Sequence, residues 1–344
     1  MTAATVIARS MRGRVSATLV GLAALLVAIG LAIVAGPVAT SPADVAAAFA
    51  RALQADPATG ADALVVSVRL PRAILAALVG AALAVCGVVM QALFRNPLAE
   101  PGIVGVSSGA AVGAVVAIVT GVAVSSWWAL PAAAFVGALA AALIVQLVAA
   151  SAGGAPSTLV LIGIAMNAFL GAIVAALIAA APDAANAQRV MFWLNGDLTA
   201  RTWGDVAIAA GPIVVCVAAL LTAGRALDLF SLGEEQASST GVPTGVARNT
   251  LLALAALATG AAVCVTGVIS FVGLVVPHLV RLALGGGHRL LLPVSAVGGA
   301  VFLVLADLAA RMIFDPIVLQ TGTITALIGA PALVLLVLRG RRRA

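Results

Sequence analysis

Residues 73–94 read AILAALVGAALAVCGVVMQALF, a run without a single charged side chain. About 20 apolar residues form a helix long enough to cross the hydrocarbon of a bilayer, so this run suffices for one membrane span. In hydrocarbon every backbone amide needs a partner within the protein, and a helix provides that partner. The sequence therefore predicts a helical membrane protein. The period-two alternation typical of a membrane β-barrel is absent.

The rest of the chain has the same character. Hydrophobic residues make up 63% and charged residues 9%, whereas about a quarter of the residues of a soluble domain are charged. Further charge-free runs cover 101–182, 206–224, 249–280, 290–306 and 316–338. We therefore expect an all-α polytopic protein in which residues 1–344 form one transmembrane domain.

Turn signals and tail charges divide these runs into spans. Breaks at 121–128 and 151–157 split the longest run into three helices. The run 249–280 is either one long tilted helix or two helices with a break near 267–273. The arginine-rich tails at 9–14 and 339–343 are both expected in the cytoplasm, which requires an even number of spans and so favours ten over nine. The predicted spans are 15–36, 72–94, 103–120, 129–150, 157–181, 204–224, two within 249–280, 290–311 and 322–338.

Ten spans suggest two five-span repeats, and an odd-numbered repeat must be inverted. Gly87–Gln91 and Gly267–Phe271 are predicted to occupy comparable positions in the two halves. Residues 42–53, between the first two spans, are predicted to form a short surface helix. The apolar run at 15–35 exceeds the h-region of a signal peptide, which indicates an uncleaved first span.

The basic residues are all arginines, 18 in number. Ten spans place twelve of them in the cytoplasm and six outside, which is the expected bias and explains the net charge of +6 better than nucleic-acid binding does. A phosphate-binding P-loop requires a lysine, so this chain cannot hydrolyse ATP by that route. Cys86, Cys216 and Cys264 have no metal or redox spacing and are interpreted as small buried hydrophobes.

One compact polar segment interrupts the apolar sequence, at Asp228–Ala237, which we call the island. Leu229, Leu232 and Gln236 recur at helical spacing, and Gly233 and Gly241 are potential breakers. Two short helices are predicted, with a solvated loop as the alternative. Six spans precede the island, so it is expected in the cytoplasm.

Three groups of motifs carry a family resemblance. They are Arg69-Leu-Pro-Arg72 with Arg95-Asn-Pro-Leu-Ala-Glu-Pro-Gly102, the island continued to Gly241-Val242, and Gly273-Leu-Val-Val-Pro-His-Leu-Val-Arg281 with His288-Arg289 and Thr325-Ala-Leu-Ile-Gly-Ala-Pro331. Together they resemble the ten-helix permeases of ABC importers for iron-siderophores, heme and vitamin B12. The resemblance covers essentially the whole chain.

The resemblance implies that the island is the coupling segment, inserted into a cleft of a nucleotide-binding subunit. Leu232 and Ala237 would pack there, Gly233 and Gly241 would shape the segment, and Asp228, Glu234 and Glu235 would make polar contacts. Arg69, Arg72 and Arg311 match positions that meet acidic residues of a periplasmic binding protein. The first two lie on one helical face and could instead anchor the helix at the headgroups. Asp307 lies one turn before Arg311 and could pair with it.

In similar permeases the turns at Asn96–Leu98 and Ser157–Thr158 act as cytoplasmic gates; Ser157 could also simply cap a helix. Residues 188–196 would form a short helix at the pathway mouth, with a counterpart near 316–320. Its Met191, Phe192 and Trp193 could face a flat cargo, although interfacial anchoring explains a tryptophan equally well. His278 and His288 are interpreted as structural, so no metal site is expected.

The implied protein is a homodimeric permease of the bacterial inner membrane, with both termini in the cytoplasm. Two separate ATPase subunits would bind ATP and Mg²⁺, one periplasmic binding protein would deliver cargo, and this chain would bind no cofactor and no nucleic acid. An iron chelate is the expected cargo, with heme slightly ahead of siderophores and vitamin B12 as the alternative. A secondary transporter driven by an ion gradient is the competing class, and an intramembrane enzyme lacks any suitable cluster of His, Glu or Asp.

Overall fold

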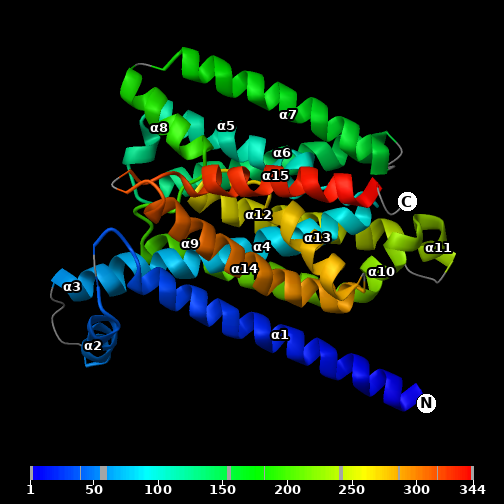
Figure 1. The fold of residues 1–344 in the computed structure, drawn as a ribbon. Helices are drawn as coiled ribbons and strands as arrows, with labels where there is room; N and C mark the ends of the chain where they lie inside the picture. Colours follow the sequence, from blue (N-terminus) through cyan, green and yellow to red (C-terminus); the bar gives the residue numbers. More distant parts are fainter. Residues whose placement is uncertain are drawn as a thin grey trace.

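The computed structural model describes residues 3–38, 40–54, 60–152, 156–181, 183–239, 243–285, 287–315 and 317–341. Every regular element in these ranges is helical, as Figure 1 shows. The main helices are α1 (Ala3–Val34), α2 (Pro42–Leu53), α3 (Gly60–Ala63), α4 (Leu70–Leu93), α5 (Val106–Val119), α6 (Ala129–Ser151), α7 (Pro156–Ala179), α8 (Ala184–Leu194), α9 (Trp203–Leu221), α10 (Gly224–Leu232), α11 (Glu234–Ser239), α12 (Thr244–Thr266), α13 (Val272–Leu284), α14 (His288–Met312) and α15 (Thr321–Arg341).

Seven described helices are long and apolar enough to cross a membrane, namely α1, α4 with its preceding turn, α6, α7, α9, α12 and α14. Three shorter apolar helices accompany them: α5, α13 and the Thr321–Leu335 part of α15. Each predicted span thus coincides with an apolar helix. The open question at 249–280 is settled in favour of two helices, because α12 ends at Thr266 and α13 begins at Val272.

Helix α4 is the centre of the bundle, because 19 of its 24 residues are buried. Its glycines bring other helices close: a Cβ on Gly80 would overlap the backbone of Gly299 in α14, and one on Gly87 would overlap Gly273 in α13. Lipid tails are as apolar as leucine, so membrane helices associate largely through such close small-residue packing. The sequence of α4 therefore encodes both a span and two helix–helix contacts.

The two ends of the bundle carry different features (Figure 1). Both chain ends and α10–α11 lie at one end, called the island end below, whereas α2, α3 and α8 lie at the other. The predicted surface helix is confirmed as α2, where Ser41 accepts from the Asp44 N–H and Asp44 accepts from the Ser41 N–H. This reciprocal capping box closes the first turn of the helix.

A repeat of local structure relates the two halves of the chain. The short helix α5 begins after Gly105 at φ 82°, and the short helix α13 begins after Phe271 at φ 69°. Each follows a long, buried helix, α4 or α12. The predicted match of Gly87–Gln91 with Gly267–Phe271 is wrong, because the first segment lies inside α4 and the second is the non-helical link before α13.

Candidate functional site

The island folds into two short helices, as predicted, α10 and α11. Gly233 separates them at φ 126° and ψ 152°, a backbone conformation that residues with a Cβ rarely adopt. A Cβ there would also overlap Oε1 of Gln236. The solvated-loop alternative is thus wrong. Gly241 lies outside the described residues, as do the side chains of Glu234 and Glu235.

Some side chains of the island contact the rest of the chain, whereas others are exposed. Leu232, the last residue of α10, is 66% exposed. Ala237 is fully buried within this chain, so the prediction that it packs into a partner is not met in this conformation. The carboxylate of Asp228 is also engaged, because it accepts from the His288 N–H at 3.0 Å and lies 2.7 Å from Nδ1 of His288. Asp228 therefore ties α10 to the first residue of α14.

An ion cluster lies where α4 begins and α14 ends. Asp307 accepts from Nε and Nη2 of Arg72 at 2.9 and 2.8 Å, across 235 positions of sequence. Thr321 donates its hydroxyl to Asp307 at 2.9 Å. The predicted pair with Arg311 is present, with Nε 3.4 Å from Oδ2 of Asp307. All three charged side chains are buried, and the stronger partner, Arg72, was not anticipated as one.

Arg69 has a different task from Arg72. It donates through Nη1 to the carbonyls of Ile33 and Val34, at 2.7 and 2.9 Å, and through Nη2 to the carbonyl of Val38. The last carbonyls of a helix have no partner inside the helix, so this guanidinium closes α1. Arg311 adds a hydrogen bond to the Ala32 carbonyl at 3.1 Å.

Docking by these arginines is not favoured by this arrangement. Arg69, Arg72 and Arg311 are all less than a tenth exposed, and their guanidinium groups serve partners within the chain. They do not present free charge to another protein here. Docking stays a prediction that requires these contacts to open.

The predicted gate residues lie at surface turns. Asn96 and Leu98 are exposed in the turn after α4, where Asn96 Oδ1 accepts from the Leu98 N–H at 2.9 Å. Ser157 is exposed and Thr158 half-buried. Both lie inside the first turn of α7, which begins at Pro156, so Ser157 does not precede the helix as a cap. Their gating role stays a prediction.

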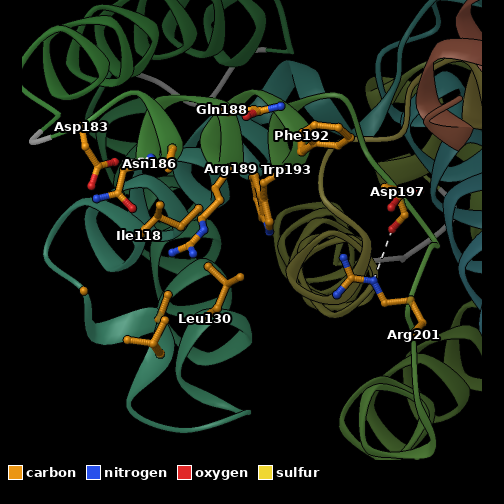
Figure 2. A pocket seen from close by; sticks show the side chains of 14 residues that line it. Ile118, Leu130, Asp183, Asn186, Gln188, Arg189, Phe192, Trp193, Asp197 and Arg201 are labelled. Atoms are coloured by element: carbon orange, nitrogen blue, oxygen red, sulfur yellow. Dashed lines mark hydrogen bonds between the residues drawn. The ribbon is translucent and has the colours of Figure 1, made fainter. Parts of the chain in front are cut away.

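A cavity of about 780 Å³ lies beside α8, between that helix and the facing ends of α5 and α6 (Figure 2). The short helix predicted at 188–196 is present within α8, although no helix forms at 317–320, the place of its expected counterpart, and its position at a pathway mouth stays a prediction. Phe192 lines the cavity and is half exposed, and Met191 is exposed. Trp193 is 6% exposed and belongs to the core, which leaves little of its ring for a cargo.

A second cavity, of about 550 Å³, lies against α15. Its walls are the C-terminal end of α8, the link between α12 and α13, and the first turns of α15. Most of its lining is apolar, with Asn195, Ser270 and Thr323 as the polar exceptions. An apolar wall with a few polar groups is typical of small-molecule sites.

One ionisable residue was overlooked by sequence reasoning. Glu100, in the link between α4 and α5, lines a small cavity with Thr259 and Ser270. Burial raises the pKa of Glu100. A hydrogen bond from the Phe271 N–H acts in the opposite direction and lowers this pKa. The signal was present in the sequence, because a glutamate lies between the two prolines of Pro-Leu-Ala-Glu-Pro, but its burial depends on α12 and α13.

Metal binding finds no support among the described residues, which contain no group of three or more His, Cys, Asp or Glu side chains placed to hold an ion. Cys86, Cys216 and Cys264 are free and buried, as predicted. His288 is buried against Asp228 and His278 is half-buried on α13.

Comparison with known proteins extends this picture. The chain is 46% identical to the cobalamin import permease BtuC of Halobacterium salinarum, over 83% of this chain and 76% of that protein. It is 42% identical to the hemin transport permease HmuU of Yersinia pestis, over 80% and 84%. A solved structure described as an inward-facing conformation of a metal-chelate type ABC transporter superposes with a TM-score of 0.83 at 30% identity, covering 94% of this chain and 98% of that one. The profile of the FecCD transport family matches residues 24–339, and the chain therefore belongs to this family.

Proposed function

We propose that the chain is the permease subunit of a bacterial ABC importer that moves a metal chelate across the inner membrane. The observation that carries the proposal is the α10–α11 segment, which ends α10 on an exposed leucine at the same end of the bundle as both termini. A chain without a P-loop lysine needs another subunit for ATP hydrolysis. The exposed Leu232 is the natural contact for that subunit.

The proposed topology has ten spans in two inverted five-helix repeats, all within one domain over residues 1–344. Support comes from the paired short helices α5 and α13, each started by a residue at positive φ. Transporters with inverted repeats place their pathway at the repeat interface, which would lie near the links that precede α5 and α13. The termini and the island face the cytoplasm in this topology, because the arginine bias requires it.

The working unit is proposed to be a homodimer with two ATPase subunits, which bind ATP and Mg²⁺, and one periplasmic binding protein. Helix α7 supports the dimer, since Leu161, Ile164 and Phe169 are more than half exposed on it. The cavity against α15 would then form one wall of a pathway between two copies. Asn96, Leu98, Ser157 and Thr158 would narrow its cytoplasmic exit.

We also propose that a periplasmic binding protein docks at Arg69, Arg72 and Arg311, and that these arginines exchange partners on docking. An acidic residue of the binding protein would replace Asp307 or the α1 carbonyls as partner. Such charge pairs contribute to orientation and association rate more than to affinity. ATP binding would draw the two ATPase subunits together and move α10–α11, and through the Asp228–His288 contact the motion would reach α14.

Replacing Leu232 by glutamate tests the coupling role. A charged side chain on this exposed position leaves the fold intact but cannot enter an apolar cleft of the ATPase. We expect uptake into proteoliposomes to fall at least about tenfold, as for loss of a buried leucine at an interface hot spot. ATPase activity of the assembled complex should persist without stimulation by loaded binding protein.

The control is Leu161→Glu on α7, an equally exposed leucine outside the island. It would impair dimer assembly instead of coupling, which size-exclusion chromatography separates from the Leu232 effect. Unchanged, ATP-coupled uptake by the Leu232→Glu complex would contradict the assignment of the island.

The proposed cargo is an iron chelate, with heme first and cobalamin second. The exposed Phe192 and Met191 near the mouth suit a flat apolar ring, and relatives are named for both hemin and cobalamin. Competing uptake of heme, cobalamin and a ferric siderophore by the complete complex decides among them. We expect heme to be taken up fastest, and a faster rate for cobalamin would transfer the assignment to the alternative.

The same uptake assay separates the competing class, an ion-coupled transporter. Glu100 is the group that could serve such a mechanism, because it is a largely buried carboxylate next to the α12–α13 link. We expect uptake to require ATP and to survive a proton uncoupler. Uptake without ATPase subunits that stops on addition of the uncoupler would favour the gradient-driven reading.

A further inference from the structure

A fourth cavity, of about 290 Å³, lies at the island end of the bundle, against the turn that carries Asn96. It is bounded by the end of α4 and the turn that follows, by α10, and by α13 and α14. Its polar lining consists of Gln91, Arg95, Asn96, Ser231, Arg281 and His288. No Asp or Glu lines it in the described part of the chain. Two arginines thus line the cavity, and the carboxylate of Asp228, which does not line it, is engaged with His288.

Arg281 is held in place by a hydrogen bond to another side chain. Its Nη1 donates to Oε1 of Gln91 at 3.1 Å, and Nε2 of Gln91 donates to the Gly273 carbonyl at 3.1 Å. This chain of bonds fixes one N–H of the guanidinium and leaves the others available. Arg281 has no carboxylate within ion-pair distance in the described part of the chain, although it is half-buried. A partly desolvated cation without a counterion is costly, so a bound anion would stabilise it.

Arg95 occupies a backbone position that favours glycine. It follows α4 at φ 46°, with its N–H bonded to the Ala92 carbonyl and the Asn96 N–H bonded to the Gln91 carbonyl. These two bonds form a Schellman motif, whose left-handed residue is usually glycine. An arginine there costs backbone strain, and such strain concentrates at functional positions. The sequence keeps a cation where glycine would be more stable.

His288 adds a third polar group to the same wall. Its Nδ1 lies 2.7 Å from Oδ1 of Asp228, and its buried Nε2 has no hydrogen-bond partner; with both nitrogens protonated, Nε2 could donate to an anion. Around the cavity, α13 exposes leucines on either side of Arg281, namely Leu279, Leu282 and Leu284. A charged recess bordered by exposed leucines at the end of membrane helices matches the boundary between headgroups and acyl chains.

We propose that this cavity binds a phosphate group, the chemistry shared by an anionic lipid headgroup and a free phosphate. The planar guanidinium of Arg281 suits two phosphate oxygens, and Arg95 closes the site from the turn. The side-chain amide of Asn96 can donate to a remaining oxygen, whereas the Ser231 hydroxyl already donates to the Leu227 carbonyl at 2.7 Å. Because α10 forms one wall, an occupied site would also steady the island against α4 and α13.

The test measures retention of phosphatidylglycerol and of inorganic phosphate by the full chain purified in an uncharged detergent. Radiolabelled phosphatidylglycerol is offered against phosphatidylcholine in mixed micelles, and labelled phosphate by equilibrium dialysis. We expect Arg95→Gly with Arg281→Gln to reduce retention at least about tenfold, as for loss of charge-assisted hydrogen bonds. Retention of the lipid alone identifies a headgroup site, and retention of phosphate alone identifies a soluble ligand.

Two variants keep the result decisive. Arg95→Gly alone relieves the strained backbone, so it must fold, and it should still lower retention severalfold. Arg225→Gln removes an exposed arginine at the same end that does not line the cavity, and it should change nothing. The proposal is overturned if the wild-type chain retains neither probe, or if Arg225→Gln loses as much as the cavity variants do. Weakened capture of the ATPase subunit by Arg281→Gln, with retention of both probes unchanged, also overturns it.

Discussion

Replacing Asp307 by alanine is expected to cost about 3–5 kcal/mol of stability, because it leaves two buried arginines without their counterion. Asp307 accepts three hydrogen bonds from Arg72 and one from Thr321, and it lies 3.4 Å from Nε of Arg311. The loss falls where α4, α14 and α15 meet, so these helices should separate first. The readout is the midpoint of thermal unfolding of the purified chain in detergent.

Two further variants test whether the lost charge of Asp307 causes the loss of stability. Asp307→Asn retains an acceptor for Thr321 and Arg72 but no charge, so its midpoint should lie between those of the wild type and the alanine variant. Asp315→Ala removes an exposed carboxylate just beyond the same helix and should leave the midpoint unchanged. If Asp307→Ala unfolds at the wild-type temperature, the cluster does not hold the bundle together.

Replacing Gly80 by alanine should be strongly destabilising although the change adds one methyl group. The new Cβ would overlap the carbonyl group of Gly299, with Leu303 Cβ at 2.9 Å, so α4 and α14 would have to move apart. Overpacking of this kind typically costs about 1–3 kcal/mol, and backbone on both sides allows no relief by a rotamer change. Thermal unfolding in detergent again measures the effect, together with the yield of folded chain.

The matched control is Gly30→Ala in α1, where a Cβ meets nothing within 4 Å. Helix propensity alone acts there and favours alanine by about 0.5–1 kcal/mol, so the two substitutions should have opposite signs. A neutral or stabilising Gly80→Ala would mean that α4 and α14 do not rely on this contact.

Local sequence patterns were sufficient to predict the helices. Charge-free runs, glycine-rich breaks and caps act over a few residues, and they predicted the apolar helices, the surface helix α2 and the division of the island at Gly233. The break at 267–271 was left open between one helix and two, because an apolar run carries no periodic signal when all its faces are buried. Motif resemblance then identified the family.

Local sequence patterns could not predict which residues the polar groups contact. The predicted pair of Asp307 with Arg311, four residues away, is present, but its hydrogen bonds come from Thr321 and from Arg72, 235 positions earlier, which local pattern did not reveal. Ala237 and Trp193 were assigned to outside surfaces, yet both are buried. Arg69 was assigned to a docking face, yet it closes α1.

The sequence by itself thus determined where the chain is helical, where the helices stop and that it belongs in a bilayer, because backbone satisfaction in hydrocarbon is decided within each segment. Only the tertiary structure decided which arginine meets which carboxylate, and which glycine faces which backbone. Those pairings depend on how helices far apart in the chain pack against each other. This packing decides both which backbones come close and which charges become buried.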